Sequence, residues 1–238
     1  MTPSSISATA AQAIQVYGGL ERWQSAKTIE AEVSVSGLAF RMKRRPFFDH
    51  AKITMDVHTP HSRLTPIGKG PAVSGVLHGH HVKLVDGSGK VLAERQNARA
   101  AFGWNRRLFF WDDLDMAYFA NYAFWNYFTL PALLANTAIE WREQKAGILD
   151  ARFPAAIPTH SHKQRFYFDT FSGLLKQHNY TADIISVMAY AANVVLEHQS
   201  MDGWPFAVRR QVSPQLGGSH SLGVPVLIDI HVHRFQLS

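Results

Sequence analysis

Histidine and tyrosine side chains that could exchange protons recur on the strand predicted over residues 174–183. His178 and Tyr180 lie on one face of that strand, since side chains of a strand alternate with period two. Imidazole titrates near neutral pH, and a phenol can donate or accept a proton, so both are candidate acid–base residues. The alternative is cross-strand polar pairing on a solvent-exposed face, and the pattern fits either interpretation.

Further polar residues could complete such a group. His198 lies on the next predicted strand and either Arg209 or Arg210 on the one after it, and Asp183 follows Tyr180 at the end of the first. His160 lies in a loop that leads into a strand. It is either a catalytic group at the edge of a lid or a turn residue hydrogen-bonded to the backbone.

Histidine pairs at alternate positions suggest metal binding, but their surroundings argue against it. His78 and His80 share a strand face, as do His231 and His233, and imidazole is a ligand for Zn, Cu, Ni or Fe. However, aliphatic residues alternate with histidines in 226–233, which places the histidines on the wet face. We therefore expect no metal site.

Sequence motifs for other chemistries are absent, and the sequence has no cysteine. The glycines have turn spacing, and no GxSxG, P-loop or GxGxxG motif is present. Hydrolase, nucleotide-hydrolase and dinucleotide chemistry therefore have no support, and we expect no cofactor.

A stretch rich in aromatic residues must organise the elements around these residues. Ten of the twenty positions 109–128 are aromatic, and each such side chain buries roughly 150–250 Å². Tyr118, Tyr122 and Trp125 recur at the period of a helix, and aspartates at 112, 113 and 115 favour its N-terminus. The segment is either core or a helix that also contacts a flat ligand.

Most of the remaining chain alternates with period two, which predicts eight to ten strands. Residues 28–36 are typical, and Leu38–Arg44 is expected to be the partner strand. Residues 8–24 predict a first helix. We expect one domain over 1–238 of the α+β class, mainly antiparallel β. Its curved half-barrel sheet would carry a helical lid on the concave face.

The net charge of +6 permits an anionic partner, but 41–45 is the only tight cluster of basic residues. We expect that cluster to be solvated and predict no nucleic-acid binding. The N-terminus shows no secretory signal. Every apolar run is shorter than the ~20 residues that span a bilayer, so we predict a cytoplasmic protein without stable membrane insertion.

Three parts of the chain resemble a bacterial family of unassigned function within the LolA/LolB-like superfamily. They are FFWDDLD (109–115) with YFANYAFWNY (118–127); FP (153–154), THS (159–161), QRFYFD (164–169) and GLLKQHNY (173–180); and YGGLERW (17–23).

This resemblance implies a half-open antiparallel barrel with a helical lid and an apolar cavity. Members of the superfamily carry lipoprotein acyl chains, and a relative similar to the violacein-pathway enzyme VioE processes an aromatic intermediate without a cofactor. The sequence lacks the carriers' secretion signal and lipidation cysteine, which argues against lipoprotein transport.

The leading hypothesis is a protein that binds a hydrophobic or aromatic small molecule in a half-barrel cavity. One version is a VioE-like, cofactor-independent enzyme of a biosynthetic pathway that uses His and Tyr acid–base chemistry; the alternative is a non-catalytic carrier of a lipid or acyl chain. The predicted catalytic residues are His160, His178, Tyr180 and His198. The predicted ligand-binding residues are Trp111, Tyr118, Tyr122, Trp125, Asp183 and Arg209.

Overall fold

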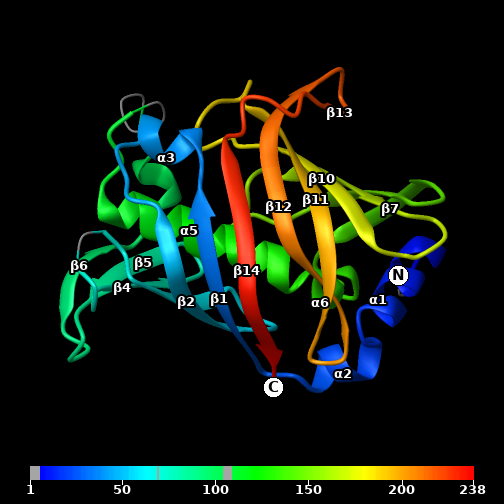
Figure 1. The fold of residues 1–238 in the computed structure, drawn as a ribbon, viewed down its shortest axis with the longest axis horizontal. Helices are drawn as coiled ribbons and strands as arrows, with labels where there is room; N and C mark the ends of the chain where they lie inside the picture. The colour runs from blue at the N-terminus through cyan, green and yellow to red at the C-terminus, as the bar shows by residue number, and fades with distance from the viewer. Residues whose placement is uncertain (1–5, 69, 104–108) are drawn as a thin grey trace.

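An open, curved antiparallel sheet of 14 strands dominates the computed structural model, which describes residues 6–68, 70–103 and 109–238 (Figure 1). The strand order is β6-β5-β4-β3-β2-β1-β14-β12-β11-β10-β9-β8-β7, and the short β13 pairs with β12. The first arm consists of β1 (Thr28–Ser36), β2 (Phe48–Asp56), β3 (His61–Thr65), β4 (Ser74–His78), β5 (His81–Val85) and β6 (Val91–Arg95). The second arm consists of β7 (Glu140–Lys145), β8 (Ile148–Arg152), β9 (Lys163–Phe168), β10 (Leu175–Thr181), β11 (Tyr190–Met201), β12 (Trp204–Leu216), β13 (His220–Ser221) and β14 (Ile228–Leu237).

The two arms meet at the pairing of β1 with β14. The register places Ile29 opposite Leu237 and Val35 opposite Ile230. Their alternation follows the sequence pattern, because the aliphatic residues of both strands are buried while polar neighbours face out. The prediction of a mainly antiparallel curved sheet is therefore confirmed, although eight to ten strands was too few.

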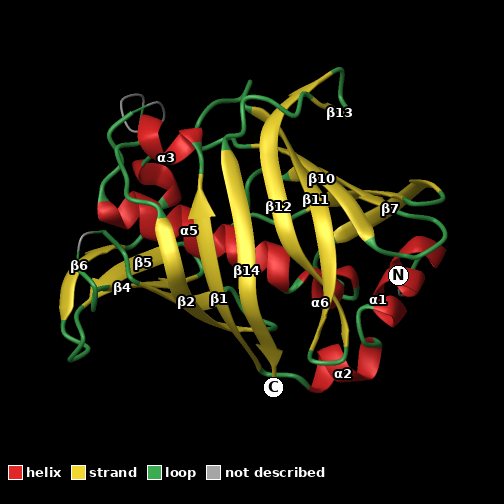
Figure 2. Ribbon diagram, in the orientation of Figure 1, coloured by secondary structure: helices red, strands yellow, loops and turns green. Residues whose placement is uncertain are grey.

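The helices of the described residues are α1 (Ala8–Val16), α2 (Leu20–Ser25), α3 (Leu38–Met42), α5 (Asp113–Phe128) and α6 (Leu130–Leu134), with a 3₁₀ turn η1 (Arg99–Ala101). The single helix predicted over residues 8–24 is two helices in the structure, because Gly18 and Gly19 both adopt positive φ between α1 and α2. Figure 2 shows α5 running across one face of the sheet, behind β1, β2 and β14.

Helix α5 begins at a reciprocal cap. The carboxylate of Asp112 accepts from the Asp115 N–H at 2.8 Å, and Asp115 accepts from the Asp112 N–H at 3.1 Å. Arg95 on β6 binds both carboxylates, at 2.8 and 2.7 Å. This neutralises the acidic cap and fixes the start of α5 to the edge of the sheet.

Nearly every residue of α5 is buried, so the helix lies in the core instead of presenting one apolar stripe. It packs on β3, β4 and β5. Close approach is possible at Gly75 of β4, where a Cβ atom would lie 2.6 Å from the Cβ of Ala117. Asn121 donates to the Gly75 carbonyl at 3.2 Å and accepts from Ser62 at 2.7 Å, which locks the helix on the sheet.

The expected strand over Leu38–Arg44 is wrong, because its first part is α3. Both edges of β1 are already paired, with β2 and with β14, so no position beside β1 is left for this segment. Gly37 turns the chain at a φ of 131°. The N–H groups of Leu38 and Ala39 then bond the carbonyls of residues 226 and 227.

Candidate functional site

A buried polar cluster surrounds His160, which lies in the loop between β8 and β9. The Tyr127 hydroxyl is 2.8 Å from Nε2, and the Tyr122 hydroxyl is 3.4 Å from Nδ1. The Tyr180 ring stacks on the imidazole at 3.8 Å between centroids, and its hydroxyl is 2.9 Å from that of Tyr127. Helix α5 and strand β10 thus enclose His160 on both sides.

Burial controls the protonation of this cluster. It lowers the pKa of His160 to about 3, with a further contribution from the Arg99 guanidinium. It raises the pKa of Tyr127 to about 12 and that of Tyr180 well above the ordinary value. The imidazole is therefore neutral and the phenols protonated at pH 7. A neutral imidazole has one donor and one acceptor, and the two hydroxyls satisfy both.

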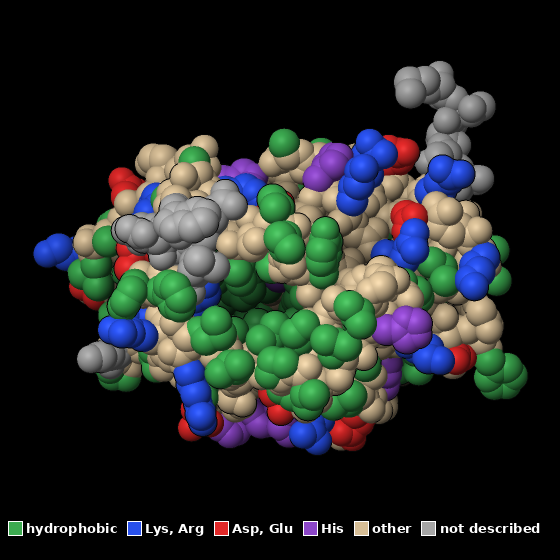
Figure 3. Space-filling model, turned by 90° about the horizontal axis from the view of Figure 1, so that it is seen from above, with side chains coloured by type: hydrophobic (Ala, Val, Ile, Leu, Met, Phe, Trp, Pro, Cys, Tyr) green, Lys and Arg blue, Asp and Glu red, His purple; other side chains and the backbone are tan. Residues whose placement is uncertain are grey.

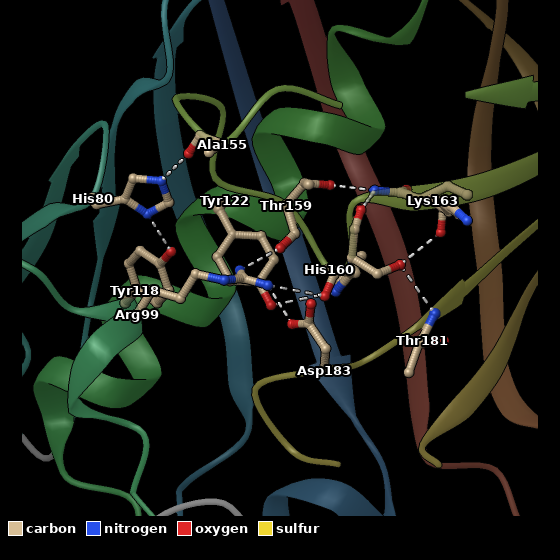
Figure 4. Close-up of polar contacts among 12 residues, drawn as sticks. His80, Arg99, Tyr118, Tyr122, Ala155, Thr159, His160, Lys163, Thr181 and Asp183 are labelled. Carbon is tan, nitrogen blue, oxygen red and sulfur yellow. Dashed lines mark hydrogen bonds and ion pairs between the residues drawn. The ribbon is translucent and has the colours of Figure 1, made fainter. Parts of the chain in front are cut away.

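Arg99 fixes the loop that carries His160 (Figure 4). It donates to the carbonyl of Thr159 at 2.7 Å and to that of His160 at 3.4 Å, and it pairs with Asp183. Asp183 follows β10, so one guanidinium joins η1, the loop and the end of β10. In the same view His80 joins the Tyr118 hydroxyl to the Ala155 carbonyl, both at 2.8 Å.

His178 lies in the same interior but has its own partners. Its Nε2 is 2.5 Å from Gln164 Oε1, and its ring stacks on Phe166 at 4.1 Å. Burial, followed by His160 and Arg210, holds its pKa well below the ordinary value. His178 is therefore a neutral, buried and hydrogen-bonded residue.

Arg210 is a buried cation that faces this cluster from β12. Its guanidinium lies 5.5 Å from the centre of the Tyr127 ring, and burial lowers its pKa. Its Nε has no hydrogen-bond partner within the described part of the chain. Tyr17 and Tyr180 also act on it electrostatically. The electron-rich faces and oxygens of tyrosines therefore surround this charge.

An apolar cavity of about 250 Å³ opens beside the cluster, at the end of the sheet where α3 lies. Figure 3 shows this face as a hollow with hydrophobic side chains gathered around it. The lining residues include Phe40 of α3, Trp111, Met116 and Phe119 at the start of α5, and Tyr180. Lys43 is the only charged side chain among the lining residues described.

Lys43 is almost fully buried, and its ammonium lies 4.9 Å from the centre of the Trp111 ring. Burial lowers its pKa to about 8, while the charge of Asp115 acts in the opposite direction. The cavity therefore has apolar walls and one lysine whose pKa, about 8, lies close to neutral pH.

The cluster and the cavity touch through two side chains. Tyr180 lines the cavity and bonds Tyr127, while Phe119 lines the cavity and meets the His160 ring edge-on at 5.6 Å. A chain of hydrogen bonds therefore runs from the cavity wall at Tyr180 through Tyr127 to His160.

The structure brings only some of the predicted residues together. His160, His178, Tyr180 and Tyr122 form the buried cluster, and Trp111 and Tyr180 line the cavity. His198 pairs instead with the Tyr17 hydroxyl at 2.9 Å, and its pKa is lowered to about 4, mainly by burial.

The other predicted ligand-binding residues have structural partners. Tyr118 bonds His80, and the indole of Trp125 donates to the Asp56 carbonyl at 2.8 Å. Asp183 pairs with Arg99. Arg209 is exposed on the opposite face from Arg210 and lies 3.9 Å from Asp229. Their roles in binding stay predictions.

Two features of the site escaped the sequence analysis. Lys43 belongs to the basic run that was expected to be solvated, and only its place at the C-terminal end of α3 turns it inward. Tyr127 follows the aromatic pattern of α5 without standing out from it. For Tyr127 the nearby asparagines were a usable signal, because Asn121 and Asn126 mark where the helix meets polar groups.

Metal ligation has no geometric basis in residues 6–68, 70–103 and 109–238. No group of three or more His, Asp or Glu side chains there could hold an ion. In the same residues, no helix has the length and apolar character needed to cross a membrane.

Comparison with known proteins gives a fold and no family assignment. No family model matches the chain, and no curated protein matches it. Among solved structures, it is similar to a LolA superfamily protein from Nitrosomonas europaea, with a TM-score of 0.51 at 8% identity over 97% of this chain and 92% of that one.

Two further solved structures agree. A DUF1329 family protein from Desulfovibrio piger gives a TM-score of 0.51 at 9% identity, over 97% of this chain and 92% of that one. A domain named for outer membrane lipoprotein sorting, from Vibrio parahaemolyticus, gives 0.50 at 10% identity, over 97% and 91%. At these identities the likeness concerns the backbone alone. The chain has a LolA-like fold.

Proposed function

We propose that the protein binds one hydrophobic or aromatic small molecule in the cavity beside α3, with the region from Trp111 to Phe119 as the lid. The observation that carries this proposal is the chemistry of the walls, which are apolar except for Lys43. Ligand pockets are typically apolar with a few placed polar groups. The LolA-like fold supports it, because one structural neighbour is named for lipoprotein sorting.

The size of the cavity restricts the ligand. A dry cavity of roughly 150 Å³ accepts one benzene ring, and drug-sized ligands occupy roughly 300 Å³ or more. At about 250 Å³, the cavity fits a substituted ring or a short acyl chain better than several chains at once. A larger lipid would require the lid to move.

Native mass spectrometry, compared with denaturing mass spectrometry, tests this proposal by identifying any molecule that is released on unfolding. Binding of N-phenyl-1-naphthylamine, an uncharged fluorescent probe, gives an affinity. Ala189→Phe fills the cavity, since Ala189 is one of its lining residues, and should weaken probe binding at least tenfold. Ala138→Phe, at an exposed position outside the cavity, is the control. Equal affinity in both variants would place the probe elsewhere.

A second candidate function is cofactor-independent acid–base catalysis on such a molecule in a biosynthetic pathway. The hydrogen-bonded chain from Tyr180 to His160 favours it, because it leads from the cavity wall to an imidazole. The pKa of about 3 weighs against it: protonating His160 at pH 7 costs roughly 5 kcal/mol. Binding is therefore the stronger proposal, and a carrier of a lipid or acyl chain is its simplest form.

The two candidates separate once a ligand is identified. Tyr180→Phe keeps the ring that lines the cavity but removes the hydroxyl at the end of the chain. For a carrier, the variant should bind normally and nothing should be turned over by either protein. For an enzyme, binding should persist while conversion of the ligand is lost. Unchanged turnover in Tyr180→Phe, His178→Ala and His160→Ala would refute the assignment of catalytic residues.

A further inference from the structure

The mouth of the cavity is surrounded by apolar side chains that face solvent. Three lining residues are themselves exposed, namely Met42, Tyr190 and Met188, the last at 77%. Val187, beside Met188, is 71% exposed. These residues come from α3 and from the segment that leads into β11, including its first residue Tyr190, so two distant parts of the chain contribute to one rim.

The rim extends through residues that pack on the lining. Phe47 is exposed and meets Phe40 edge-on at 5.7 Å. Phe110 is exposed beside Trp111, and Val224 is exposed in the segment that leads to Leu227. Isolated exposed apolar residues are normal on a protein surface. A group of them gathered around a cavity mouth marks a site of interaction (Figure 3).

Two exposed arginines lie on the same rim. The guanidinium of Arg44 lies 4.4 Å from the centre of the Phe110 ring, and that of Arg41 lies 6.0 Å from that of Phe47. The nearby Arg45 pairs with Asp113, so among the described residues of α3 and the turn after it Arg41 and Arg44 are the exposed cations. Aromatic and aliphatic tips beside cations suit the boundary between lipid headgroups and acyl chains.

We propose that this rim docks on the surface of an anionic lipid bilayer, peripherally, with the cavity mouth facing the membrane. The exposed apolar side chains reach below the headgroups, and Arg41 and Arg44 bind anionic headgroups. The complementary charge favours a membrane over a second copy of this chain, because two copies would bring like-charged arginines together across the contact. Docking does not depend on the identity of the cavity ligand.

Sedimentation with vesicles tests this proposal. The protein should sediment with vesicles that contain phosphatidylserine, bind phosphatidylcholine vesicles far more weakly, and be released by salt. Each cation near an anionic surface contributes about fivefold in partition, so Arg41→Gln with Arg44→Gln should reduce it about thirtyfold. Val187→Ser with Met188→Ser should also weaken binding, by the same factor at every salt concentration at which binding of the wild type can still be measured.

Matched controls lie away from the mouth. Phe171→Ser removes a side chain that is 96% exposed in the turn before β10, and Arg63→Gln removes an exposed arginine of β3. Both should bind vesicles like the wild type, and all four variants should unfold at the wild-type temperature. The proposal is overturned if the controls lose as much binding as the rim variants. It is also overturned if the wild type does not sediment with phosphatidylserine vesicles; loss of a dimer in Val187→Ser with Met188→Ser would then assign the rim to a second copy of this chain.

Discussion

Replacing Gly75 by alanine should show how tightly α5 is held on the sheet. The new Cβ would lie 2.6 Å from the Cβ of Ala117 and 3.0 Å from Cγ1 of Ile67. Carbon atoms prefer roughly 3.5–4.0 Å, so the deficit at Ala117 is about 1 Å. Ile67 can rotate, but Ala117 has no rotatable side chain. The helix must therefore move away from β4.

The expected loss follows from this displacement. Overpacking typically costs about 1–3 kcal/mol, and the movement also strains the bond from Asn121 to the Gly75 carbonyl. Alanine recovers about 0.4–1 kcal/mol by restricting the unfolded chain. The net change is about 2 kcal/mol in the free energy of unfolding, or a fall of about 4–8 °C in Tm for a domain of this length.

Chemical denaturation measures this change, with Gly103→Ala as the control because, its chain neighbours aside, no atom of the described residues lies within 4 Å of its added methyl group. That control should match or slightly exceed wild-type stability. Ala117→Gly alone should cost about 1 kcal/mol or more. The double variant should lose less stability than the sum of the two single losses, by about 1 kcal/mol or more. Additive losses, or a stable Gly75→Ala variant, would refute the close approach.

Other predictions concern the titratable groups. Below pH 6.5 the unfolded chain protonates His160 while the folded chain, with a pKa of about 3, does not, so His160 lowers stability as the pH falls, by up to about 1.4 kcal/mol per unit. His160→Asn should therefore make denaturation midpoints less dependent on pH between 7 and 5, while the dependence that comes from the lowered pKa values of His178 and His198 remains. The pKa of Lys43 is about 8, so binding of the uncharged probe should tighten as pH rises from 7 to 9, since binding desolvates the ammonium further. Lys43→Met should bind the probe several-fold more tightly at pH 7 and abolish that dependence; a slope that persists would contradict it. Tyr127→Phe leaves buried partners unpaired and should cost about 1–3 kcal/mol in thermal unfolding, whereas exposed Tyr190→Phe should cost less than about 0.5 kcal/mol.

The alternation of β1 and β14 could be predicted from the sequence because each of these strands has one face exposed to solvent. Ile230 and Val232 are buried and His231 is exposed, as the pattern over 226–233 predicts. The helical period of α5 was equally clear. Its burial on all sides was not, because periodicity shows which residues share a face and says nothing of how many faces are covered.

The prediction of the site was limited because the sequence does not show which of two neighbouring residues in a strand points inward. Arg209 and Arg210 are neighbours, and only one of them can face inward. The register of β11 against β12 shifts between Val195 and Glu197 and again at His198, so counting alternate residues from either end gives different answers. The position of the loop residue His160 depends on long-range contacts with α5 and η1, and a local sequence pattern cannot predict such contacts.

The pairing of β1 with β14 also has a consequence for synthesis on the ribosome. Each arm consists of hairpins between neighbouring strands, which can form as the chain emerges. The cavity walls include Ile228, which lies on β14, the strand of this sheet that comes latest along the described chain. Until β14 is inserted, one edge of β1 and one edge of β12 are unpaired, and the residues that will form the cavity are open to water. Until β14 has been synthesised and paired, a nascent chain thus presents an unpaired sheet edge and an open apolar cavity, which are the features that favour aggregation.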